Sequence, residues 1–179
     1  MVAFANNNSL TRRITLCALI TAAAVIVHSV EALLPPLVPG VPIKLGLANV
    51  FTLIALIMLG ARYALITAVL RCIIAVLITG AVSRLPYCLT GAILSFAVMW
   101  LMEKPRRYDR ISCVGQSVLG SFTFNVGQIA VGILIVGRAM IAYFPLMSLI
   151  SVPTGIFTGL VAHYSLKILM RTDYGYKKS

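Results

Sequence analysis

Several charged and polar side chains interrupt otherwise apolar stretches of this sequence, and they are the residues that could do chemistry. Because polar groups at membrane depth are costly, each needs a partner or a ligand. Their net charge is positive, which favours a ligand with an anionic head group, either a carboxylate or a phosphate. The surrounding Leu, Ile, Phe and Met side chains would suit an apolar body on that ligand. The candidate substrate-binding residues are Glu31, Lys44, Asn49, Arg71, Tyr87, Asn125 and Gln128.

Arg71 lies near the middle of the apolar stretch Tyr63–Gly80, roughly 13 Å from its inner end at the helical rise of 1.5 Å per residue. An arginine at that depth is expected to face a cavity, a carboxylate or an anionic ligand. The alternative is a structural pair with Glu31, which requires tilted helices or an arginine that reaches outward, because Glu31 lies near the outer end of its own stretch. Both interpretations remain open.

Asn125 and Gln128 are three residues apart, so both amides lie on one face of a helix. Gly127 between them would allow a neighbouring helix or a ligand to approach closely. The alternative role for these amides is an interhelical hydrogen bond. His28 shares a helix face with Glu31, and a hydrogen-bonded packing role is favoured over a proton relay.

The composition indicates an integral membrane protein with a single domain. The 179 residues are 60% hydrophobic and only 11% charged, whereas soluble domains carry about 25% charged residues. The net charge of +11 is assigned to loops facing the cytoplasm. It is not assigned to nucleic-acid binding, which needs a basic face beside aromatic residues on a soluble fold.

Apolar runs predict an all-α bundle of six transmembrane helices. A span needs about 20 mostly apolar residues, and these runs do not alternate as barrel strands do. The second run is short, and the sixth is long enough to be tilted, bent or broken at Pro145 and Pro153. The expected spans are Ile14–Leu34, Leu45–Leu59, Tyr63–Gly80, Pro86–Met102, Ile111–Val136 and Ile141–Met170.

The distribution of lysine and arginine predicts that both chain ends are cytoplasmic. Residues 1–12 and 171–179 are then cytoplasmic tails of the single domain 1–179, and the charged segment Glu103–Arg110 is an inner connector. The segment Leu34–Lys44 is an outer loop stiffened by four prolines, and we expect it to act as a lid. The N-terminal apolar run is interpreted as a retained first helix and not as a signal peptide.

No catalytic or metal site is predicted. Cys17, Cys72, Cys88 and Cys113 lie in or beside apolar runs without a C-x-x-C pair, so they are expected to be buried small hydrophobes without a disulfide or a metal. The sequence has no phosphate-binding loop of the G-x-x-x-x-G-K-[ST] type and no aspartate-rich pair, because its two aspartates are isolated. We therefore expect the chain itself to bind no cofactor and catalyse no reaction.

The segments PGVPIKLGLANVFTLIALIMLG and FNVGQIAVGIL, with Arg71, the residues Tyr143–Pro145 and a glycine-rich last helix, resemble the Gx transporter family. That family is also named heptaprenyl diphosphate synthase component I, and it is similar to the S components of energy-coupling factor (ECF) transporters. The resemblance covers Thr11–Met170. Where the family often has histidine before the Asn of N-x-G-Q, this chain has Phe124.

The resemblance implies a six-helix S component in a bacterial cell membrane that captures a vitamin or a quinone- or isoprenoid-related precursor. The loop Leu34–Lys44 would gate its site. Ala18 and Ala22 form a small-xxx-small motif, which in S components meets a membrane scaffold subunit. Two ATPase subunits would use ATP. The alternatives are a non-catalytic membrane accessory subunit of polyprenyl diphosphate synthesis, or a stand-alone secondary transporter, for which no inverted repeat is evident.

Overall fold

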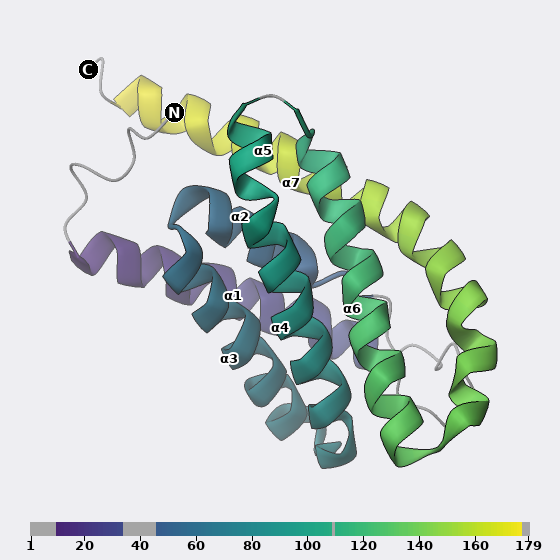
Figure 1. Ribbon diagram of the computed structural model, residues 1–179. Coiled ribbons are helices and arrows are strands. Elements are labelled where there is room, and N and C mark those ends of the chain that lie inside the picture. The colour runs from purple at the N-terminus through teal and green to yellow at the C-terminus, as the bar shows by residue number, and fades with distance from the viewer. Residues whose placement is uncertain (1–9, 34–45, 109, 177–179) are drawn as a thin grey trace.

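The structure is a computed structural model that describes residues 10–33, 46–108 and 110–176 (Figure 1). The predicted lid Leu34–Lys44 lies outside the described residues. Helices and short 3₁₀ turns make up all the regular structure of the described ranges, as predicted for an all-α protein. The α-helices are α1 (Leu10–Leu33), α2 (Asn49–Met58), α3 (Ala61–Thr79), α4 (Leu85–Leu101), α5 (Glu103–Arg107), α6 (Cys113–Ile135) and α7 (Phe144–Tyr176), and the 3₁₀ turns are η2 (Val82–Arg84) and η3 (Arg138–Tyr143).

Five helical segments of the described chain are long and apolar enough to cross a membrane: Leu10–Glu31, Ala61–Thr79, Val82–Leu101, Cys113–Ile135 and Arg138–Leu169. The second expected span is the apolar helix α2, which has only ten residues. At 1.5 Å per residue it is about 15 Å long, or half of a hydrocarbon core of about 30 Å. The described chain therefore has five full-length candidates and one half-length helix, and its orientation in the membrane stays a prediction.

The long helices pack in the order α1, α3, α4, α6 and α7, each against the next. Figure 1 shows α4 between α3 and α6, with α7 on the far side of α6. The short helix α2 contacts all five of them, and most of its side chains are buried. Its N-terminal residue Asn49 is consequently held inside the bundle, with 1% of the residue exposed.

The last helix bends but does not break at its prolines. Pro145 stands in the first turn of α7, where its missing N–H costs no helical hydrogen bond. Pro153 lies inside the helix, and the Thr154 hydroxyl next to it donates to the Ile150 carbonyl at 2.8 Å. Figure 1 shows α7 curving over the bundle, and the helix continues to Tyr176, into the segment predicted as a tail.

Glycines bring three helices into backbone contact. A Cβ at Gly127 of α6 would lie 2.8 Å from the Gly91 Cα of α4. This confirms the prediction that Gly127 permits close approach, with a helix as the neighbour. Between α6 and α7, a Cβ at Gly155 would lie 2.5 Å from the Val118 Cα. These contacts fix α4, α6 and α7 as one tightly packed half of the bundle.

Cys72 of α3 and Cys88 of α4 form a disulfide, so the prediction that the chain has no disulfide was wrong. The turn between α3 and α4 folds the chain back on itself and places the two Cα atoms 6.0 Å apart, within the usual range for a bridge. The separation of 16 residues matches no familiar cysteine motif. Cys17 and Cys113 are free thiols.

Candidate functional site: a buried polar cluster on α1, α2 and α3

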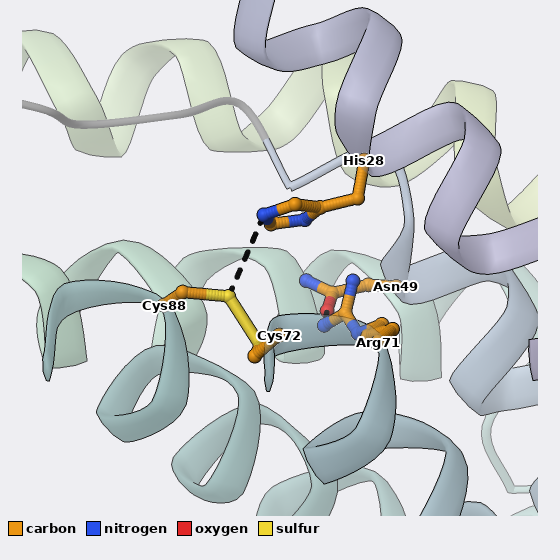
Figure 2. The surroundings of a disulfide bond; sticks show 5 residues. All are labelled: His28, Asn49, Arg71, Cys72 and Cys88. Carbon is orange, nitrogen blue, oxygen red and sulfur yellow. Dashed lines mark hydrogen bonds between the residues drawn. A yellow bond between two sulfur atoms is a disulfide. The ribbon is translucent and has the colours of Figure 1, made fainter. Parts of the chain in front are cut away.

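Arg71 and Asn49 form the centre of the candidate site. Arg71 Nη2 donates to Asn49 Oδ1 at 2.5 Å, and the exposed fraction is 0% for Arg71 and 1% for Asn49. The two residues lie equally far in sequence from Gly60, whose φ of +96° suits the turn between α2 and α3. Because α2 and α3 form an antiparallel hairpin, this equal spacing places them side by side (Figure 2).

Glu31 of α1 belongs to the same cluster. Its Oε1 accepts a hydrogen bond from the backbone N–H of Gly46 at 2.5 Å, its side chain is buried, and its charge acts on Arg71. The depths of Glu31 and Arg71, which the sequence left unmatched, therefore agree in the folded chain. The Glu31 carboxylate thus binds the backbone of Gly46, the first described residue after the predicted lid.

Phe124 of α6 lies against Arg71, with the guanidinium Cζ 5.9 Å from the ring centroid. This distance is that of a cation–π contact. The ring fits because two glycines border it: a Cβ at Gly46 would lie 2.8 Å from Phe124 Cδ1, and one at Gly91 would lie 3.0 Å from Cδ2. No sequence pattern predicts a role for Phe124, because Gly46 and Gly91 come beside its ring only in the folded chain.

Hydrogen-bond donors remain open at this centre. Within the described part of the chain, Arg71 Nε and Nη1 and Asn49 Nδ2 are buried without a hydrogen-bond partner. Leaving a buried donor unsatisfied costs about 1–3 kcal/mol, and more for a charged group. The N-terminus of α2 adds only the partial positive charge of its dipole at the same place, because the N–H groups of Asn49, Val50 and Phe51 already donate to backbone carbonyls of residues 46–48. Together these groups form a site that can accept an anion.

Figure 2 shows His28 of α1 reaching toward the disulfide, beside the Arg71–Asn49 pair. His28 Nε2 lies 3.7 Å from Cys88 Sγ, and the imidazole is buried. Cys72 follows Arg71 in sequence, so the disulfide joins α3 to α4 at the wall of the cluster. This environment agrees with the packing role favoured for His28.

Two of the sequence-predicted residues, Tyr87 and Asn125, contact other parts of the bundle. Tyr87 is buried in an apolar cluster with Met140 and Met147. Asn125 Nδ2 donates to the Met147 carbonyl of α7 at 3.2 Å, which is the interhelical hydrogen bond considered as the alternative for this amide. Gln128 is buried on the same helix, α6. Lys44 lies outside the described residues. The structure thus brings together Glu31, Asn49 and Arg71.

Ala18 and Ala22 lie on the outside of the bundle. Both are exposed, and they line a groove of about 610 Å³ between α1 and α3. The α3 side of this groove is apolar and includes Ile66, Leu70 and Ile74. The groove is therefore separate from the buried polar cluster and faces the surroundings of the bundle.

The helices and the buried cluster define a multi-pass helical membrane protein. The chain belongs to the family described as heptaprenyl diphosphate synthase component I, whose family model matches residues 20–166. The matched range contains Glu31, Asn49, Arg71 and Phe124. No curated protein and no solved structure matches the chain.

Proposed function

We propose that this chain is the substrate-binding S component of an ECF-type importer in the cytoplasmic membrane of a bacterial-type cell. Its cargo is a small anionic, partly apolar molecule, such as a vitamin or a quinone- or isoprenoid-related precursor. The observation that carries the proposal is the fully buried Arg71, whose open donors meet the N-terminus of the half-length helix α2. Half-length helices whose N-termini face anionic substrate groups are a recurrent device of membrane transporters.

In this proposal the chain binds cargo and performs no catalysis. It binds no cofactor, and ATP is used by two partner ATPase subunits that join it through a transmembrane scaffold subunit. The family description, component I, itself implies a second subunit in a complex. The groove between α1 and α3 is the surface proposed for the scaffold, because Ala18 and Ala22 leave room there for a partner helix.

Co-purification tests this proposal. The chain is expressed with ECF scaffold and ATPase subunits and extracted in mild detergent, and the eluted proteins and retained small molecules are identified by mass spectrometry. We expect a complex of four subunits. The double variant Ala18→Leu with Ala22→Leu should lose the scaffold and ATPase subunits, because the added side chains fill the groove. Ala130→Leu, a matched change at an exposed alanine of α6, should keep them. Recovery of the chain without ATPase partners would contradict the proposal.

The family description favours a second candidate, a membrane accessory subunit of polyprenyl diphosphate synthesis. That role predicts retention of a prenyl-transferring partner subunit in the same co-purification. The third candidate, a stand-alone secondary transporter, predicts elution of the chain without any partner and uptake of cargo without ATPase subunits. The three candidates therefore give different sets of eluted proteins.

A further inference from the structure

We infer that the Arg71–Asn49 cluster binds the carboxylate of a singly charged ligand with an apolar body, and that it rejects diphosphates. This inference deepens the proposed function and rests on its assignment of the cluster as the cargo site. The inferred cargo therefore differs from the prenyl diphosphates that the family description suggests.

The geometry of the donors favours a carboxylate. One nitrogen of the Arg71 guanidinium, Nη2, is bonded to Asn49 Oδ1, and Nε and Nη1 remain open. A planar guanidinium has two edges that match the two oxygens of a carboxylate, one formed by Nε with Nη2 and the other by Nη1 with Nη2. Nη2 carries two N–H groups and gives one to Asn49, so its other N–H can complete one of these edges with Nε or Nη1. Asn49 Nδ2 offers a further open donor beside them. The Phe124 ring holds the guanidinium from one side, so these donors are already oriented before a ligand arrives.

The charges around the site favour a single negative charge on the ligand. Among the described residues of the cluster, the charged side chains are Arg71 and Glu31, which balance each other. The N-terminus of α2 adds about half a positive charge. One carboxylate therefore changes the local charge from about +0.5 to about −0.5, which is the smallest excess that a ligand carrying a full negative charge can leave. A diphosphate would bring at least one further charge to a site without water, and burying an uncompensated charge there costs several kcal/mol.

The walls of the site favour an apolar body on the ligand. The side chains of Ala68, Ala92 and Phe124 form one buried apolar cluster together with the two bridged cysteines, and Arg71 stands over its aromatic ring. An apolar group attached to the carboxylate would lie beside these apolar side chains, whereas a polar group there would lack hydrogen-bond partners.

Calorimetric titration of the full chain in detergent tests the inference with three probes. These are 2-naphthoate, its neutral amide 2-naphthamide, and geranyl diphosphate. We expect 2-naphthoate to bind at least tenfold more tightly than either of the other two. Equal or tighter binding of geranyl diphosphate would overturn the inference, and so would a folded chain that does not bind 2-naphthoate.

Asn49→Asp supplies a variant that does not depend on disrupting the fold. The new carboxylate would stand at hydrogen-bond distance from Arg71 Nη2 and at a helix N-terminus, so we expect an unchanged or raised melting temperature. The new carboxylate would accept hydrogen bonds from Arg71 and repel an anionic ligand. The affinity for 2-naphthoate should therefore fall at least tenfold. Wild-type affinity in Asn49→Asp would overturn the inference.

These titrations use the chain alone and need no partner subunit. Failure of the carboxylate assignment therefore leaves the co-purification result standing, and absence of ATPase partners leaves the titration result standing. The two outcomes distinguish an error in the ligand class from an error in the proposed function.

Discussion

Two buried polar contacts of this molecule differ in how their hydrogen bonds are completed. At the contact between α6 and α7, the hydroxyls of Ser117 and Thr158 lie 2.8 Å apart, and Thr158 also donates to the Thr154 carbonyl at 2.8 Å. At the contact of α2 with α3, Arg71 and Asn49 bond each other but keep open donors. Completed polar contacts hold helices together, whereas open and oriented donors are suited to a ligand.

The largest effect is expected where α6 and α7 touch through their backbones. Gly155→Ala would place a Cβ 2.5 Å from the Val118 Cα, and overpacking of this kind costs about 1–3 kcal/mol. The melting temperature in detergent should fall clearly. Gly115→Ala is the control on α6, because its Cβ would meet only the Ile111 and Ser112 side chains at 3.2 Å or more. Equal melting temperatures for the two variants would contradict the packing described for α6 and α7.

A smaller effect is expected at Phe124, the α6 residue that contacts Arg71. Gly91→Ala would place a Cβ 2.8 Å from the Phe124 carbonyl oxygen and 3.0 Å from its ring, which displaces the ring from beneath Arg71. We expect 2-naphthoate affinity to fall about tenfold, equivalent to about 1.4 kcal/mol, because the guanidinium loses its fixed orientation. Unchanged affinity, measured by the same titration, would show that Phe124 does not orient Arg71.

Much of the architecture follows from the sequence because apolar runs of membrane length form helices whatever their neighbours. The runs around Arg71 and Asn125 became α3 and α6 nearly as predicted. The stretch Leu45–Leu59 shows the limit, because apolar composition does not reveal where a helix begins. The helix starts only at Asn49, after a turn at Gly46, and this start places Asn49 inside the bundle.

The candidate site was predictable only in part. Arg71 and Glu31 were recognisable because charges at membrane depth need partners, and the equal spacing of Asn49 and Arg71 about Gly60 was a usable signal. Tyr87 and Asn125 were grouped with them because depth alone cannot tell one side of a helix bundle from the other. The disulfide and the position of Phe124 depend on contacts between distant segments, which no local pattern reports.

The central claim is that the cluster with open donors binds cargo, whereas the completed contacts stabilise the fold. A paired measurement of melting temperature and 2-naphthoate affinity on two variants tests it most directly. In Glu31→Gln with Arg71→Gln, both buried charges are removed, so stability should be retained or raised while affinity falls at least tenfold. In Thr158→Val, the contact with Ser117 is lost, so stability should fall by about 0.6–2 kcal/mol while affinity is retained. The reverse pattern, with stability lost in the first variant and affinity lost in the second, would contradict the account.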